Sequence, residues 1–229
     1  MKPLIVANWK CNPTSLAEAK RLFNYVEKGV KNFKNVEVVI CPPFPYLPMV
    51  GMASQSGVKL GGQDVFWEEK GAFTGEVSPL MLKNLGCQYV IIGHSERRRN
   101  FKETDKMVNK KLKAALKIGL RPILCIEKVS MVKKDIRGIS KNELKKIILA
   151  YEPAWAIGTG KPCSIEKAKK MNSLFRKILN KNVLLYGGSV NSQNARDFIK
   201  KAKFQGLLIG GASLNPQEFI KIVKNISKN

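Results

Sequence analysis

The sequence predicts one α/β domain over residues 1–229, in which eight parallel strands and their helices close into a (β/α)8 barrel. Three observations favour this fold class. Short apolar runs recur along the chain, most are followed by a helical pattern, and no change of composition divides the sequence. Near-continuous apolar runs are typical of strands buried on both faces, and strand–helix alternation indicates a parallel sheet with helical crossovers.

Eight apolar runs mark the expected strands. An open doubly wound sheet and a closed barrel would both accommodate them, but the polar or glycine-rich stretch after nearly every run favours the barrel. Barrels of this type have about 250 residues, so this chain is a little short, and its tightest stretch lies between Glu127 and Lys146. The expected strands are Leu4–Asn8, Val36–Cys41, Val58–Gln63, Tyr89–Gly93, Pro122–Ile126, Ile147–Tyr151, Val183–Gly187 and Leu207–Gly210.

Helix start and stop signals fall between these runs. Ser15–Glu18 and Ser140–Glu143 have the spacing of capping boxes, and Ser164 is placed to cap the helix that follows it. Asn215–Pro216 combines an N-cap with a proline at the first helical position, and Gly119 stands where a helix ends. Each signal lies where a barrel requires a crossover helix.

Composition bounds the class of protein. The chain is 44% hydrophobic, and it has neither a signal-like N-terminal run nor an apolar stretch long enough to span a membrane. Its five cysteines form no CxxC pair, which favours reduced thiols and a cytoplasmic location. The net charge of +24 suggests nucleic acid as a partner. The lysines are spread over several helical stretches without interleaved aromatics, so a solvated surface is favoured, with no nucleic-acid and no membrane partner.

Chemically capable residues follow several of the expected strands, where a barrel of this kind carries its active site. They are Asn8 and Lys10 after the first strand, His94 after the fourth, Glu152 after the sixth, Ser189 after the seventh, and Gly210 and Gly211 after the eighth. Taken singly, the lysine could lie at the surface, the histidine could be a packing residue and the glutamate could form a salt bridge. Their convergence at one rim favours a functional site.

This set suits proton transfer beside a carbonyl group. A carboxylate base could take the proton, an imidazole at a helix N-terminus could donate to the developing enediolate oxygen, and a lysine could stabilise the same charge. Backbone N–H groups of glycine turns could hold a phosphate. The GTGKP stretch lacks the P-loop pattern, and there is no GxGxxG, no GxSxG and no metal-ligand spacing, so we expect neither a cofactor nor a metal.

Six motifs, taken together and in order, resemble the triosephosphate isomerase family: NWK, GAFTGEVS, GHSERR, AYEPAWAIGTG, YGGSV and IGGASL. The resemblance covers the chain from the first strand to the last and implies a TIM barrel. It also implies an intramolecular oxidoreductase (an aldose–ketose isomerase of glycolysis and gluconeogenesis) that interconverts dihydroxyacetone phosphate and D-glyceraldehyde 3-phosphate without cofactor or metal. The alternatives are another phosphate-binding enzyme on the same barrel and a basic nucleic-acid-binding protein.

The resemblance also implies residue roles. Glu152 corresponds to the base, His94 to a neutral electrophile, Lys10 to its electrostatic partner, and Glu96 to a supporting residue. Substrate binding is implied for Asn8 and Lys10, and phosphate binding for Gly158, Ser189, Gly210 and Gly211.

Two segments are implied to act as loops of the family. Pro153–Lys161 corresponds to a lid with Trp155 and Ile157 as its apolar body, and Gly71–Ser78, with Thr74 near its tip, to a loop that inserts into a second subunit of a homodimer. The chain departs from the pattern elsewhere. CIEK lacks a glycine, Cys11 replaces a methionine and Gln205 replaces an aspartate. The segment after CIEK is short, so we expect a small or irregular fifth helix.

Overall fold

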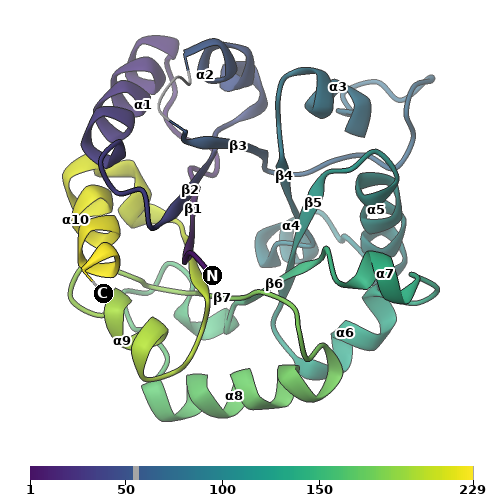
Figure 1. Ribbon diagram of the computed structural model, residues 1–229. Coiled ribbons are helices and arrows are strands. Elements are labelled where there is room, and N and C mark those ends of the chain that lie inside the picture. The colour runs from purple at the N-terminus through teal and green to yellow at the C-terminus, as the bar shows by residue number, and fades with distance from the viewer. Residues whose placement is uncertain (54–56, 229) are drawn as a thin grey trace.

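A computed structural model describes residues 1–53 and 57–228 of the chain. Eight parallel strands form a closed barrel in sequence order, with β1 completing the ring beside β8. Figure 1 shows helices surrounding this ring. The predicted (β/α)8 barrel is therefore confirmed. The domain expected over 1–229 includes residues 54–56 and 229, which lie outside the described residues.

All eight predicted strands are confirmed, with ends that shift by at most one residue. Every strand is almost wholly buried, which explains why the sequence shows continuous apolar runs. The strands are β1 (Leu4–Asn8), β2 (Glu37–Cys41), β3 (Lys59–Gly62), β4 (Tyr89–Ile92), β5 (Arg121–Ile126), β6 (Ile148–Tyr151), β7 (Leu184–Gly187) and β8 (Gly206–Ile209).

Helices lie in each connection between consecutive strands. The β5–β6 connection holds two short helices, so the expectation of a small or irregular fifth helix is confirmed. The α-helices are α1 (Leu16–Val30), α2 (Leu47–Ala53), α3 (Pro79–Asn84), α4 (Ser95–Asn100), α5 (Asp105–Lys117), α6 (Val129–Asp135), α7 (Lys141–Leu144), α8 (Ile165–Ile178), α9 (Ala195–Lys200) and α10 (Pro216–Ser227). Single 3₁₀ turns are η1 (Phe44–Tyr46), η2 (Ala154–Ala156) and η3 (Gly211–Leu214).

The helix caps follow the sequence signals with one correction. Ser164 and Asn215 accept hydrogen bonds from the backbone of the first turns of α8 and α10, at 3.3 and 3.1 Å. The reciprocal capping box is present at Ser140–Glu143. At Ser15–Glu18 only one half forms, because Ser15 Oγ accepts from the Glu18 N–H at 3.3 Å while Glu18 does not return the bond. Gly119, with a φ of 77°, follows α5 as expected.

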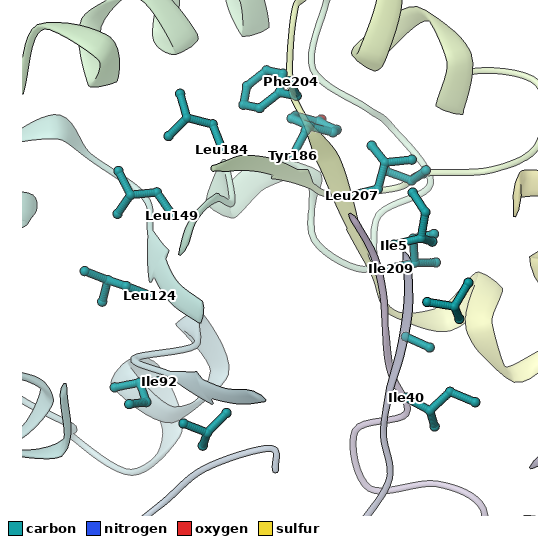
Figure 2. Packing of buried hydrophobic residues seen from close by; sticks show 14 of the residues in the cluster. Ile5, Ile40, Ile92, Leu124, Leu149, Leu184, Tyr186, Phe204, Leu207 and Ile209 are labelled. Carbon is teal, nitrogen blue, oxygen red and sulfur yellow. The ribbon is translucent and has the colours of Figure 1, made fainter. Parts of the chain in front are cut away.

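The core has two layers because successive strand residues point to opposite faces of the sheet. In β1, Leu4 and Val6 fill the barrel interior, while Ile5 and Ala7 pack between the strands and the helices. Figure 2 shows the outer layer, in which side chains such as Leu124 point away from the barrel axis. This double burial gives the strand ends a rigid frame from which to present side chains.

A buried ion cluster lies outside the barrel beneath α4. Lys111 of α5 is 2% exposed, and its ammonium donates to both Asp64 oxygens at 2.8 Å and to Glu103. Arg97 Nε lies 2.8 Å from Asp64 Oδ2. Two cations and two carboxylates therefore balance one another and tie the β3–α3 connection to α4 and α5. In the part of the chain that the structure describes, no helix is long and apolar enough to cross a membrane.

Candidate active site

A cavity of about 370 Å³ opens at the C-terminal end of the barrel strands. It brings together the predicted residues that follow five strands: Asn8, Lys10, His94, Glu152, Gly158, Ser189, Gly210 and Gly211. Glu96 does not line the cavity and contacts it through Lys10. The residues that sequence reasoning placed at one rim thus share one cavity.

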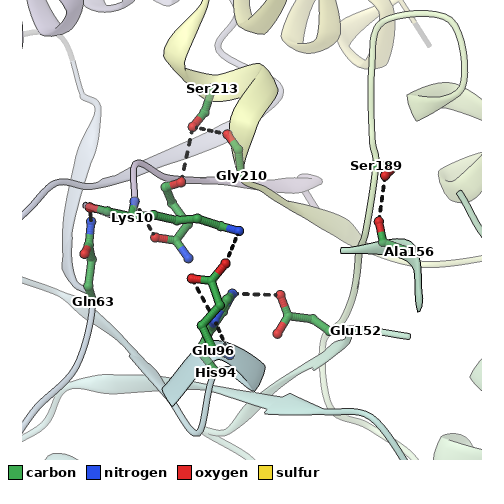
Figure 3. A network of polar contacts seen from close by, with 10 residues as sticks. Lys10, Gln63, His94, Glu96, Glu152, Ala156, Ser189, Gly210 and Ser213 are labelled. Atoms are coloured by element: carbon green, nitrogen blue, oxygen red, sulfur yellow. Dashed lines mark hydrogen bonds and ion pairs between the residues drawn. The ribbon is translucent and has the colours of Figure 1, made fainter. Parts of the chain in front are cut away.

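His94 and Glu152 form a buried pair in this cavity (Figure 3). His94 Nε2 lies 3.2 Å from Glu152 Oε1, and the two side chains are 6% and 5% exposed. His94 caps the N-terminus of α4, directly after β4, and Glu152 follows β6. The pair is therefore held by barrel strands separated only by β5.

The His94 ring has a defined hydrogen-bonding pattern. Its Nδ1 accepts from the Glu96 backbone N–H at 3.2 Å, so a neutral ring carries its proton on Nε2, facing the cavity and Glu152. Burial lowers the pKa of His94, while the Glu152 and Glu96 carboxylates raise it, and the net direction in the unliganded site is upward. The bond to Nδ1 favours the neutral ring, and the carboxylates oppose it.

Glu152 is buried, yet its surroundings favour the ionised form of the carboxyl. Burial raises the pKa of this carboxyl, but His94, the Cys125 thiol and Lys10 lower it, and the net direction is downward. Its second oxygen, Oε2, has no hydrogen-bond partner among the described residues. A carboxyl whose pKa is lowered and whose second oxygen has no hydrogen-bond partner is suited to accept a proton.

Lys10 reaches the cavity from a strained backbone. Its φ is 55°, in the left-handed region that residues other than glycine rarely adopt. Two contacts hold this conformation: the Lys10 N–H donates to Asn8 Oδ1 at 3.0 Å, and Gln63 Nε2 donates to the Lys10 carbonyl at 2.9 Å. Its ammonium forms an ion pair with Glu96. A Cβ on Gly210 would lie 3.1 Å from Lys10 Cε, so the glycine leaves room for the lysine.

The opposite wall of the cavity consists of glycine turns. Gly158 has a φ of 73°, and a Cβ there would meet nothing within 4 Å, as would one on Gly211. Gly210 precedes the 3₁₀ turn η3, and Ser213 Oγ fixes it by donating to the Gly210 carbonyl at 2.7 Å. Such turns allow an anionic group to approach the backbone closely.

The segment Pro153–Lys161, which includes Gly158, is held at Ala156, and the chain is fixed again at Cys163, two residues beyond the segment. Ser189 Oγ donates to the Ala156 carbonyl at 2.6 Å, and the N–H of Cys163 donates to the Tyr186 hydroxyl at 2.9 Å. The segment was expected to have Trp155 and Ile157 as its apolar body, but its most buried apolar side chain is Ala156. Ala156 is fully buried, whereas Trp155 is 49% exposed and lies under the Lys167 ammonium, 3.9 Å from the ring centroid.

A second cavity, of about 580 Å³, lies on the far side of Glu152 and is lined in part by Ser95, Cys125 and Trp155. It is also lined by Arg98 and Arg99, but it contains neither His94 nor Lys10, nor the glycine turns at Gly158, Gly210 and Gly211. Residues 1–53 and 57–228 contain no group of three metal-ligating side chains placed to hold a metal ion.

Sequence reasoning missed two contributors to the site. Gln63 fixes the Lys10 carbonyl, and Cys125 places its thiol against Glu152. Cys125 could have been found from the alternation along β5, because it shares the inward face with Ile123. No sequence pattern marks Gln63 as part of the site, because its role depends on the backbone conformation of Lys10.

The fold and these side chains define a (β/α)8-barrel enzyme with a carboxylate–imidazole pair beside an anion-binding wall. Comparison with known proteins is more specific. A sequence model of triosephosphate isomerase matches residues 3–226. The triosephosphate isomerase of Dictyoglomus turgidum is 43% identical over 248 aligned positions, covering 98% of this chain and 99% of that protein. The Aquifex aeolicus enzyme is 44% identical, covering 97% and 99%. The chain belongs to the triosephosphate isomerase family.

Proposed function

We propose that this protein is an aldose–ketose isomerase that interconverts dihydroxyacetone phosphate and D-glyceraldehyde 3-phosphate, a step of glycolysis and gluconeogenesis. Family membership over nearly the whole chain supports this activity. The single observation that carries it is the 3.2 Å contact between His94 and Glu152 in a cavity that also holds Lys10 and the glycine turns.

Glu152 is the base in this proposal. Its lowered pKa and its unpartnered Oε2 leave it able to remove a proton from the carbon beside the substrate carbonyl and return it to the neighbouring carbon. The carbon–hydrogen bond electrons pass into an enediolate, so no external oxidant or reductant is required. The hydroxyl proton also passes from one oxygen of the enediolate to the other, so substrate and product differ in the positions of one carbon-bound and one oxygen-bound hydrogen.

His94 and Lys10 stabilise the enediolate. The Nε2–H of a neutral His94 donates to the oxygen on which negative charge develops, and the Lys10 ammonium attracts the same charge. Glu96 orients that ammonium through their ion pair, and Asn8 supports the strained Lys10 backbone at 3.0 Å. The charge-stabilising groups are thus in place before the proton moves.

The glycine wall binds the substrate phosphate. Gly158, Ser189, Gly210 and Gly211 line the cavity and are assigned to the phosphate through their backbone N–H groups. The net charge of +24 adds a field that attracts the dianion. Closure of Pro153–Lys161 over the bound substrate excludes water, which strengthens these interactions and protects the enediolate.

A coupled spectrophotometric assay tests this proposal. The purified protein, dialysed against EDTA, is expected to convert each triose phosphate into the other without added metal or cofactor. Loss of activity on dialysis, restored by a divalent cation, would contradict the metal-free chemistry.

We also propose a cytoplasmic homodimer. The five cysteines are free, and four of them are buried, which fits a reducing compartment. The segment Gly71–Ser78 extends outward beside α3 in Figure 1, and Phe73, Leu80 and Met81 expose large apolar side chains there. A second subunit that packs on this cluster would bury these apolar side chains.

The dimer is tested by light scattering after gel filtration. Thr74→Arg places a charged side chain near the tip of this loop and should shift the mass from two chains toward one. Ser173→Arg, on exposed α8, is the matched control and should remain dimeric. A monomeric wild-type protein at micromolar concentration would contradict the proposal.

A further inference from the structure

The shortened β5–β6 connection retains a helix that buries a carboxylate. α6 has seven residues, and its last, Asp135, is 0% exposed. Asp135 Oδ2 lies 2.7 Å from Arg98 Nη2. Asn109 of α5 fixes the end of the helix by donating to the Asp135 and Arg137 carbonyls at 2.6 and 2.9 Å.

Arg98 links Asp135 to the turn at Gly93, which directly precedes His94. It lies in α4, one turn after His94, and its Nε donates to the Gly93 carbonyl at 2.8 Å. Its Nη1 donates to Asp105 Oδ1 at 2.9 Å. Because the guanidinium is planar, three acceptors in different directions fix both its position and its orientation.

Gly93 is the residue that links β4 to His94. Its φ is 70°, and a Cβ built there would lie 2.7 Å from Arg98 Nη2. The guanidinium therefore packs directly on the turn from which the His94 side chain leaves the barrel. A shift of Arg98 would move the Gly93 peptide and, with it, the imidazole relative to Glu152.

Stability alone explains Asp135 poorly. Its Oδ1 has no hydrogen-bond partner among the described residues, and burial raises its pKa to about 7, so the carboxylate pays part of its desolvation penalty without compensation. Buried ion pairs are often replaceable by apolar side chains at no cost in stability. A carboxylate that is fully buried with one oxygen unpartnered therefore calls for another role.

We propose that Asp135 is a positioning residue of the isomerase site, holding Arg98 against the Gly93 carbonyl and so fixing His94 opposite Glu152. This inference rests on the proposed function. Asp135 touches no substrate, and it acts through Arg98 and the backbone. The short α6 is then the part of the connection that the site requires.

The experiment varies the contact between Asp135 and Arg98, at pH 8. Asp135→Ala should lower kcat by about 10–100-fold, the usual range for residues that orient a catalytic group, with KM changed less than about twofold. Asp135→Asn keeps an oxygen for Arg98 and should recover most of kcat. Lys133→Ala, at an exposed position of the same helix, is the control and should stay within about twofold of wild type in both constants.

A second readout separates positioning from folding. ¹⁵N NMR of the single histidine should show shifted ring-nitrogen signals in Asp135→Ala and wild-type signals in Lys133→Ala. Unchanged kcat and ring signals in a folded Asp135→Ala protein of lower melting temperature would overturn the proposal. If Asp135→Ala does not fold, Arg98→Lys replaces it in the test, because lysine lacks the planar guanidinium. Arg98→Lys should then show the same loss of kcat and the same shift of the ring-nitrogen signals. Wild-type values of both in Arg98→Lys would overturn the proposal. An inactive wild type would refute the proposed function, while the NMR comparison would still test positioning.

Discussion

His94 Nε2 lies 3.2 Å from Glu152 Oε1, with both side chains almost wholly buried. The pair spans β4 and β6, and Cys125 of the intervening β5 contacts the same carboxylate. At this distance neither group titrates independently, since each charge changes the pKa of the other. The base and the hydrogen-bond donor of the proposed reaction are therefore one electrostatic unit.

Removal of the Glu152 charge should abolish most of the catalysis. Glu152→Gln keeps the side-chain shape but provides no base, so kcat should fall by about 10²–10⁴-fold, while inorganic phosphate still inhibits at a similar concentration. Glu166→Gln, at an exposed position in the first turn of α8, is the control and should have wild-type activity. Full activity in Glu152→Gln would remove Glu152 from the role of base.

The same substitution should lower the pKa of His94. In the wild-type protein Glu152 raises that pKa and burial lowers it. Without the carboxylate, burial dominates, and the imidazole should titrate below its ordinary pKa of about 6.5. NMR titration of the protein's only histidine measures this directly. An unchanged or higher pKa in the variant would show that Glu152 does not control the ring.

The sequence predicted the frame of this site well, for physical reasons. Strands buried on both faces must be apolar, so all eight were visible, and parallel strands place the residues after them at one end of the barrel. Lys10, His94 and Glu152 follow directly from that geometry. The glycine turns were visible because few other residues allow such turns.

Contacts that depend on side-chain direction could not be predicted in this way. The strained φ of Lys10, the support from Gln63 and the Asp135–Arg98 contact each require the relative placement of distant segments. The half-formed box at Ser15 shows the same limit on a local scale, because the motif does not determine whether Glu18 turns back toward the cap.

A methyl group at Gly158 should weaken phosphate binding. Alanine at a φ of 73° costs about 1–2 kcal/mol, although the site has open space, and the strain would displace the N–H assigned to the phosphate. Gly158→Ala should raise KM and weaken phosphate inhibition. Gly86→Ala carries a similar penalty, with a φ of 83° and open space after α3, and should leave KM unchanged. Equal KM values in the two variants would contradict the assignment of Gly158.

Loss of the buried lysine should destabilise the fold. Lys111→Met leaves the buried carboxylates Asp64 and Glu103 with Arg97 as their one remaining cation, which should lower the free energy of unfolding by about 3–5 kcal/mol. Urea denaturation measures the change. Lys117→Met breaks only the exposed pair with Glu69 and should have little effect. Similar midpoints for both variants would show that the cluster contributes little.

Asp135 should make stability depend on pH in an identifiable direction. Its pKa is about 7 in the native protein and about 3.9 when unfolded, so the native state binds the proton more tightly. The free energy of unfolding should therefore fall as pH rises from about 4 to 7. Asp135→Asn lacks this contribution, and its stability relative to wild type should rise across that window. Parallel pH profiles for the two proteins would contradict the assigned pKa.

The coupled isomerase assay on the purified, EDTA-dialysed protein decides whether this barrel catalyses the proposed reaction. We expect rapid conversion of dihydroxyacetone phosphate and D-glyceraldehyde 3-phosphate in both directions, with almost all of the activity lost in Glu152→Gln. A folded wild-type protein that leaves both triose phosphates unchanged would contradict the proposed function.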